Sequence, residues 1–102
     1  MMNQIVRSQR VVVALGKYYI HVSIYNDRVE KRFRLTKTMI DVLKALKNSS
    51  VSELKKGYND KIYLYTYRLR RQGLIDEKDR VTELGEEVLR IIDSATKIVS
   101  LT

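Results

Sequence analysis

The residues of this 102-residue chain that could do covalent chemistry are one histidine, a pair of adjacent acids and a group of tyrosines. His21 lies on the polar side of an apolar run, and we assign it a structural role. Glu86 and Glu87 are neighbours at an expected helix start, so their carboxylates do not face each other. The tyrosines of 63–67 could act as nucleophiles only beside an arginine and histidine constellation on a larger body. We therefore expect no catalytic site and predict that the protein is not an enzyme.

Cofactor and metal sites are not expected either. The chain has no cysteine, which removes both disulfides and thiolate ligands. The sequence contains no Gly-rich phosphate loop and no metal-ligand spacing. We therefore predict no cofactor and no metal, and the remaining chemistry is that of a charged and aromatic surface.

The most informative stretch is 59–75, which reads NDKIYLYTYRLRRQGLI. Asn59 or Asp60 can cap a helix start by accepting a backbone N–H, and Gly73 can end the helix in the left-handed conformation. At about 100° per residue, a set of apolar and small residues falls on one side of this helix. That set is Ile62, Tyr65, Thr66 and Leu69.

The other side of the same helix is cationic and aromatic. A solvated helix face usually mixes both charge signs, whereas Asp60 is the only acid here. Such a surface suits a groove lined with phosphates and base edges. An arginine can bind guanine O6 and N7 through two hydrogen bonds, and Leu64 could touch a thymine methyl group. The residues predicted to contact DNA are Lys61, Tyr63, Leu64, Tyr67, Arg68 and Arg71.

The net charge of +8 is unevenly distributed along the chain. Residues 50–73 carry six Lys or Arg against two acids, whereas residues 74–102 carry four against seven. The basic surplus thus coincides with the predicted DNA-contacting helix. This asymmetry favours one specific face for a polyanion over general adhesion.

A shorter helix is expected immediately before this segment, at 51–56. Ser50 or Ser52 would cap it, Leu54 would be its core contact, and Gly57-Tyr58 would form the turn into the longer helix. A short helix, a glycine-containing turn and a longer basic helix have the order of a helix-turn-helix. The side chains that could reach phosphates, or that simply keep an exposed helix in solution, are Ser52, Lys55 and Lys56.

The residues after Gly73 extend this pattern. Leu74-Ile75 is apolar, 76–80 is a polar turn, and "TELG" at 82–85 opens another helix. This order, a helix followed by "GLI", a short hairpin and "TELG", resembles the winged helix-turn-helix family. The resemblance is strongest to small transcription regulators of archaea, bacteria and archaeal viruses. The resemblance covers roughly residues 35–95.

The resemblance implies a winged helix-turn-helix. Together with the β pattern and the last helix described below, it predicts an α+β fold in which this module follows an N-terminal antiparallel β-meander and precedes a long C-terminal helix. It also implies a transcription regulator that binds double-stranded DNA and reads the major groove with helix 59–72. The expected wing departs from the usual pattern because 76–80 is short and net acidic. Only Lys78 and Arg80 could approach the minor groove or the backbone there.

Residues 9–34 have a β pattern. An apolar run at 11–15 ends at Gly16, and apolar and polar residues then alternate from 18 to 25 and from 28 to 35. Asn26-Asp27 would form a two-residue hairpin turn. We predict a three-stranded antiparallel meander. Its basic third strand is either a contact for the DNA backbone or a charge-protected edge strand.

Two further helices complete the predicted fold. One begins at Thr36 or Thr38 and runs to about Lys47. The last spans 83–102, with acids in its first turns and apolar residues at spacings of three and four. This apolar stripe is long for so small a domain, which favours a homodimer. The residues predicted for the dimer seam are Val88, Ile91, Ile92, Ala95 and Val99.

The length predicts one domain, made of a β-rich part at 1–35, the helix-turn-helix and wing at 36–82, and the last helix at 83–102. The chain has neither the apolar core of a signal peptide nor an apolar run near the ~20 residues that span a bilayer, so we expect a cytoplasmic protein and no membrane partner. Two other functions stay open, namely a protein-binding module and the binding of single-stranded nucleic acid or RNA. Salt dependence tests the first, and competition between duplex and single strands tests the second.

Overall fold

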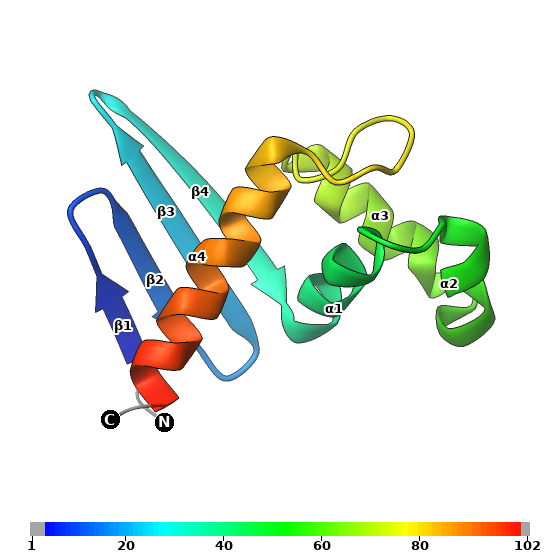
Figure 1. Ribbon diagram of the computed structural model, residues 1–102, viewed down its shortest axis with the longest axis horizontal. Coiled ribbons are helices and arrows are strands. Elements are labelled where there is room, and N and C mark those ends of the chain that lie inside the picture. Colours follow the sequence, from blue (N-terminus) through cyan, green and yellow to red (C-terminus); the bar gives the residue numbers. More distant parts are fainter. Residues whose placement is uncertain (1–3, 101–102) are drawn as a thin grey trace. The chain divides into compact units, whose positions relative to one another are not determined.

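A computed structural model describes residues 4–100 of the chain. The fold is α+β, with a four-stranded antiparallel sheet followed by four helices, of which the last is long (Figure 1). The chain divides into two compact units, one formed by 4–37 with 90–100 and the other by 38–89. No helix in the described range is long and apolar enough to cross a membrane.

The sheet of the first unit is a simple meander in the order β1-β2-β3-β4. Its strands are β1 (Gln4–Arg7), β2 (Val11–Leu15), β3 (Tyr19–Asn26) and β4 (Val29–Thr36). The antiparallel meander is as predicted, but the expectation of three strands was wrong. Gln4–Arg7 adds a fourth strand because it pairs with β2, with Val6 opposite Val13. A four-residue strand is too short to show an alternating pattern of its own.

The hairpin between β3 and β4 differs from the prediction by one residue. Asn26 pairs with Val29, so the two-residue loop is Asp27-Arg28 and not Asn26-Asp27. Asp27 takes the positive φ, 53°, that a tight hairpin turn requires. Asn26 instead belongs to β3, where its pairing with Val29 is the last pair between β3 and β4 before the turn.

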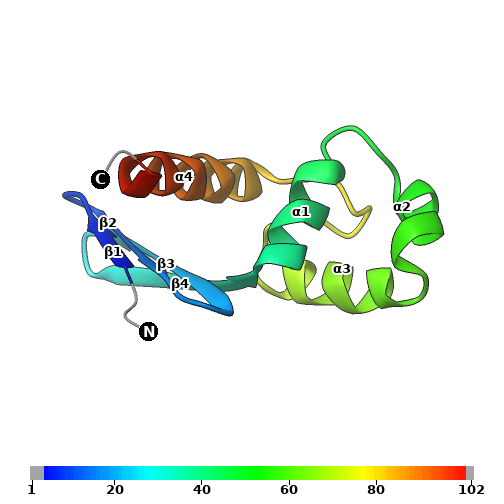
Figure 2. The same ribbon diagram turned by 90° about the horizontal axis from the view of Figure 1, so that it is seen from below.

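One face of the sheet forms the core of the first unit. Val13, Val22 and Phe33 lie side by side on the three neighbouring strands, and all three are buried. The C-terminal part of helix α4 lies across this face (Figure 2), and its Ile92 and Ala95 are buried as well. Alternation of side chains along the strands therefore points every second residue to this side of the sheet, although Val29 and Lys31 in the first half of β4 stay exposed.

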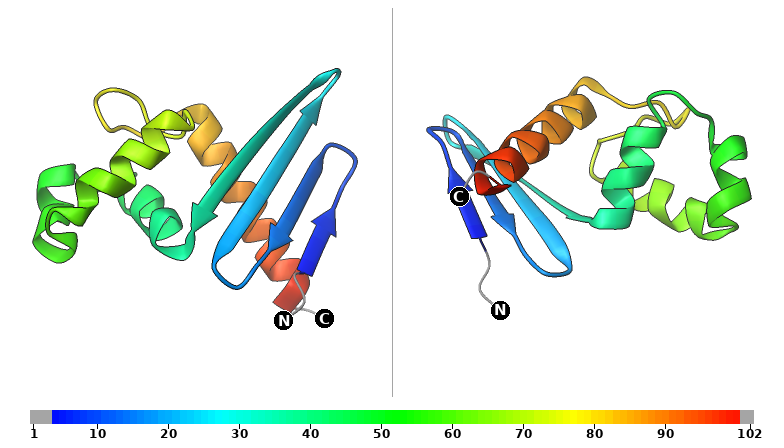
Figure 3. Two further views of the ribbon diagram at one scale, coloured as in Figure 1. Left: turned by 180° about the vertical axis from the view of Figure 1, so that it is seen from behind. Right: turned by 60° about the horizontal axis from the view of Figure 1, so that its bottom comes forward.

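The opposite face of the sheet carries the polar half of the alternation. Tyr19, His21, Ser23 and Tyr25 of β3 point to this side, as the sequence pattern predicts. Within the first unit, as far as the structure describes it, no other element covers this face, as the left view of Figure 3 shows. The first unit thus has two layers, the sheet and the C-terminal part of α4, and one face of the sheet is uncovered.

The second unit is helical. It contains α1 (Lys37–Ala45) apart from its first residue, then α2 (Val51–Tyr58), α3 (Lys61–Arg71) and the start of α4 (Glu83–Ser100). Met39, Ile40 and Leu43 of α1 are buried, and so is Leu46 just after it. Ile62 and Leu69 of α3 and Val88 of α4 are also fully buried. Helices α1 and α3, of nine and eleven residues, are stable here because each buries an apolar side.

Helix α2 begins as predicted but ends later. Ser50 is its cap, and the Ser50 hydroxyl and the Glu53 carboxylate satisfy each other's backbone N–H groups in a capping box. The predicted turn at Gly57-Tyr58 is wrong, because both residues continue the helix. The turn falls at Asn59, which adopts φ 57° and donates its backbone N–H to the Lys55 carbonyl at 2.8 Å. Leu54 is only partly buried.

Helix α3 spans Lys61–Arg71, inside the predicted 59–72. The predicted side-chain cap is absent: Asn59 is used to end α2, and Asp60 has helical backbone angles and makes no capping hydrogen bond. The end of the helix is as predicted, since Gly73 adopts φ 76°. The Gly73 carbonyl then accepts a hydrogen bond from the Thr82 hydroxyl at 2.7 Å.

The start of α4 is held against the residues that follow α3. Ile75 forms an isolated bridge with Val81, and the Thr82 hydroxyl oxygen accepts the N–H of Gly85 at 3.0 Å. At Gly85 the backbone approaches Leu74 so closely that an added Cβ would lie 2.2 Å from the Leu74 carbonyl oxygen. Glycine is required here for space.

Two glycine substitutions test this packing. Gly85→Ala should lower the free energy of unfolding by about 1–3 kcal/mol, because the methyl group overlaps a backbone carbonyl that must shift. Gly57→Ala is the matched control, since nothing lies within 4 Å of the added methyl and alanine favours the helix by about 0.5–1 kcal/mol. Chemical denaturation measures both, and equal shifts of the two variants in the same direction would contradict the close approach.

Candidate nucleic-acid interface

The exposed side of α3 brings together all six residues predicted to contact DNA. On the other side, Ile62 and Leu69 are buried, and buried Thr66 donates its hydroxyl to the Tyr63 carbonyl at 3.2 Å. Tyr65 is half-buried and meets Tyr58 of α2 edge to face at 6.0 Å. The solvent-facing set, here called the α3 face, is Lys61, Tyr63, Leu64, Tyr67, Arg68 and Arg71.

The α3 face exposes large apolar side chains to an unusual degree. Tyr63, Leu64 and Tyr67 are 52%, 46% and 51% exposed, although most other large apolar residues of the described range are at least partly buried. Single exposed apolar side chains are common on protein surfaces, whereas a group on one helix indicates a binding surface. Because α3 contains no acidic residue, this apolar group lies among cations only.

Cations pair with the aromatic rings of this face. The Lys55 Nζ atom of α2 lies 5.4 Å from the centroid of the Tyr63 ring. The Arg71 guanidinium lies 5.9 Å from the Tyr67 centroid and donates a hydrogen bond to the Tyr67 hydroxyl at 3.2 Å. Such contacts are worth about 0.5–1 kcal/mol at exposed sites and hold long side chains in place. The rings and the charges therefore form one surface across α2 and α3.

Lys55 is held in its charged form at this surface. A hydrogen bond with Tyr63 is the main cause that raises the pKa of Lys55 above its ordinary value, and the nearby Asp60 carboxylate acts in the same direction. Its Nζ atom lies 3.7 Å from an Asp60 oxygen. The other two residues predicted to contact phosphates, Ser52 and Lys56, are exposed on the same helix.

The 76–80 turn is built around one carboxylate. Asp76 accepts the backbone N–H groups of Lys78 and Arg80, each at 2.9 Å, and pairs with the Arg80 guanidinium at 3.3 Å. The Arg80 backbone hydrogen bond is the main cause that lowers the pKa of Asp76 below its ordinary value. The turn is therefore fully stabilised above the ordinary carboxyl pKa and loses this contribution as the pH falls through the lowered one.

Arg70 ties α3 to this turn through an ion pair with Asp79. No role for Arg70 could be predicted from local patterns, since a contact between residues nine apart in different elements has no local signal. Among the described residues, the buried Arg70 Nε is a side-chain nitrogen without a hydrogen-bond partner. The pair leaves Arg70 directed to the turn, whereas Arg68 and Arg71 remain on the α3 face.

A polar hollow of about 400 Å³ joins two predicted groups of residues. Ser52 of α2 lines it together with Lys78 and Arg80 of the 76–80 turn. Lys47, which follows α1 and was not among the predicted site residues, lines the same hollow. The Lys47 Nζ atom lies 3.8 Å from a Glu86 oxygen. Residues far apart in the sequence thus form one cationic edge of the second unit.

The predicted dimer seam on α4 is largely occupied by the chain itself. Val88, Ile92 and Ala95 are 0%, 3% and 2% exposed, because this side of the helix is packed in the chain's own core. Ile91 and Val99 are partly exposed. A seam made of the whole stripe would need residues that are already buried, and a homodimer stays a prediction.

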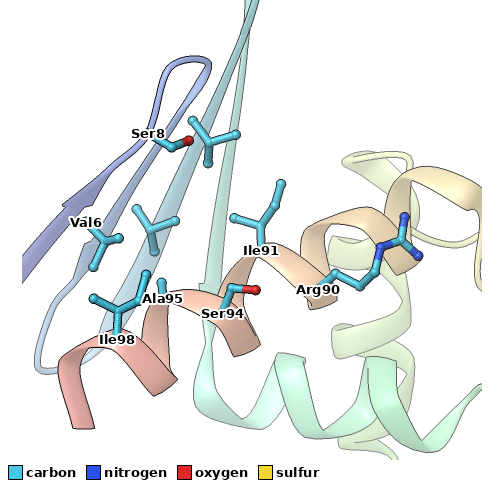
Figure 4. A pocket seen from close by; sticks show the side chains of 9 residues that line it. Val6, Ser8, Arg90, Ile91, Ser94, Ala95 and Ile98 are labelled. Atoms are coloured by element: carbon cyan, nitrogen blue, oxygen red, sulfur yellow. The ribbon is translucent and has the colours of Figure 1, made fainter. Parts of the chain in front are cut away.

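An apolar hollow of about 220 Å³ lies beside α4 in the first unit. Val6 of β1 and Ile91, Ala95 and Ile98 of α4 converge on it, whereas the Arg90 side chain extends away from them (Figure 4). Ile98 is 51% exposed. The hollow contains no cluster of polar groups that would bind a charged ligand.

In the range 4–100, no group of three or more His, Asp or Glu is placed to hold a metal ion. Comparison of the chain with protein-family models, with curated proteins and with solved structures found no match.

Proposed function

We propose that the protein binds duplex DNA in a sequence-specific manner and acts as a transcription regulator of the winged-helix type. The observation that supports this most is the α3 face, which presents exposed aromatic and aliphatic side chains among cations on a helix free of acids. An α-helix fits the major groove of B-DNA, where base edges display a distinct donor and acceptor pattern. In this proposal α3 is the recognition helix.

In this proposal, different side chains of the α3 face contact different bases. Arg68 and Arg71 can each bind a guanine through two hydrogen bonds, and Leu64 can contact a thymine methyl group. The hydrogen bond from Arg71 to Tyr67 uses one of the five N–H donors of a guanidinium, so donors remain for a base edge. Burial of Ile62 and Leu69 fixes the orientation of the helix that carries them.

The neighbouring cations supply contacts to the DNA backbone. Lys55 and Lys56 of α2 flank the α3 face, and Lys78 and Arg80 belong to the turn that serves as the wing in this proposal. Phosphate contacts set the register of a protein on DNA without reading its sequence. The wing was predicted to be net acidic, but Asp76 and Asp79 are paired with Arg80 and Arg70, which reduces their repulsion of phosphates.

The order of elements also supports the winged-helix proposal. Three helices, a hairpin closed by the Ile75–Val81 bridge and a further helix follow one another in the second unit, as in that family. The β-meander would then be an N-terminal addition to the DNA-binding part.

A homodimer remains part of the proposal. One recognition helix of eleven residues covers only a few base pairs, and two-fold pairing doubles the contacts on a near-palindromic site. The dimer would have to use apolar residues of α4 that the chain leaves exposed, such as Ile91 and Ile98. A DNA-binding role also places the protein inside the cell.

Two arginine variants test the α3 face directly. Arg68→Ala and Arg71→Ala should each weaken binding of a preferred duplex by about 1–3 kcal/mol and relax base preference at one position. Lys97→Ala, which removes the same charge from α4, is the matched control and should change affinity much less. Fluorescence anisotropy with labelled duplexes measures these affinities. If both arginine variants bind like the parent, α3 is not the reader.

Salt dependence separates DNA from a protein partner, which the exposed Tyr63, Leu64 and Tyr67 would also suit. Because phosphate contacts release counterions, log affinity for duplex DNA should fall roughly linearly with log salt concentration. Lys55→Ala and Lys56→Ala should each make this slope shallower by up to about one unit and leave base preference unchanged. A slope near zero for the parent would argue against a nucleic acid ligand.

A further inference from the structure

The open face of the sheet in the first unit combines a line of aromatic side chains with arginines. Tyr19, His21 and Tyr25 recur at even spacing on β3 and point to the same side. Tyr19 and Tyr25 are 41% and 43% exposed, and His21 is exposed too. These residues, with arginines 7, 32 and 34 beside them, are called the open sheet face below.

The pairing register places the arginines next to the aromatic line. Arg34 stands opposite His21, and Arg32 stands opposite Ser23. The Arg34 guanidinium lies 4.8 Å from the centroid of the Tyr19 ring, and the Tyr19 and His21 rings are 6.3 Å apart. Arg7 of β1 points to the same side at the other end of the sheet, opposite Val12. Aromatic surfaces and cations thus alternate over the face.

The charge of this face selects the kind of partner. Glu30 is the only acid that the register places on it, and the Glu30 carboxylate is paired with Arg32. Arg7 and Arg34 add two positive charges. A second copy of the chain packed face to face would oppose arginines to arginines, which is unfavourable. A polyanion is complementary.

We propose that the open sheet face binds single-stranded DNA, with bases stacked on the aromatic rings of β3 and phosphates bound by the arginines. Bases inside a duplex are stacked on each other, so their flat surfaces are available only in a single strand. The face is a sheet surface without a protruding helix or ribbon, and direct reading of a duplex needs an element that enters a groove. Duplex DNA is therefore the poorer ligand for this face.

The centre of the face favours deoxyribose over ribose. Ala14 stands opposite His21, Val12 stands opposite Ser23, and Ile5 is opposite Ala14 on β1. Apart from Arg7 at the end of β1, this side of β1 and β2 is apolar, and Ile5 is 55% exposed. A ribose 2′-hydroxyl laid against these side chains would lose water without gaining a hydrogen-bond partner. Deoxyribose carries no such group.

This site is separate from the duplex site proposed on α3. The aromatic line belongs to the first unit and the α3 face to the second. Loss of one binding activity should therefore leave the other in place.

The test uses a labelled oligothymidylate of about 12 nucleotides, within the range that single-strand sites cover. Tyr19→Ala and Tyr25→Ala should each weaken its binding about five- to a hundredfold in fluorescence anisotropy, because each removes a stacking surface. Tyr18→Ala is the matched control, since Tyr18 is 70% exposed but precedes β3 and lies outside the aromatic line. Tyr19→Phe should retain binding because the ring remains.

Five results would overturn the proposal. The first is that the parent does not bind oligothymidylate, and the second is that Tyr18→Ala weakens binding as much as Tyr19→Ala does. The third is that the double variant Arg68→Ala/Arg71→Ala no longer binds the single strand, and the fourth is that oligouridylate of the same length binds more tightly than oligothymidylate. Unchanged duplex binding by Tyr19→Ala supports two independent sites. Conversion of a dimer to a monomer by Tyr19→Ala, seen in sedimentation, would assign the face to self-association instead.

Discussion

Burial of one side of α3 is the constraint on which the second unit depends. Ile62, Thr66 and Leu69 recur at spacings of four and three, and all are buried, so the helix cannot rotate without exposing them. The close approach of Gly85 to Leu74 then fixes the start of α4 behind the end of α3. What remains on the outside of α3 is presented in one orientation, as recognition of a rigid partner requires.

A second regularity is that acidic side chains pair with cationic side chains or backbone N–H groups of the chain itself. Asp60 lies beside Lys55, Asp76 organises its own turn, Asp79 pairs with Arg70, and Glu30 pairs with Arg32. These pairs are exposed or partly exposed, so each adds little to stability. Their larger effect is on the surface, because negative charges near the two aromatic and basic faces are already partnered. The positive potential that would attract a polyanion is thereby less opposed.

Local patterns in the sequence were sufficient for most of the fold. The period of the apolar residues identified the helices and both sides of α3, an apolar run identified β2, alternation identified β3 and β4, and Gly73 marked a helix end. The features that local patterns did not predict depend on residues that are close in space but not in the sequence. The short β1 exists through its pairing with β2, and Arg70 gains its role from Asp79. The apolar stripe of α4 showed that one side would be buried, but its spacing could not show whether the chain itself or a second copy would cover it.

A binding selection from random duplex DNA, run in parallel with the parent and the double variant Arg68→Ala/Arg71→Ala, tests the central claim most directly. The account predicts that the parent enriches a motif containing guanine, and that this preference weakens or disappears in the double variant. Recovery of the same motif by both proteins, or of no motif by the parent, would contradict the claim that the α3 face reads DNA.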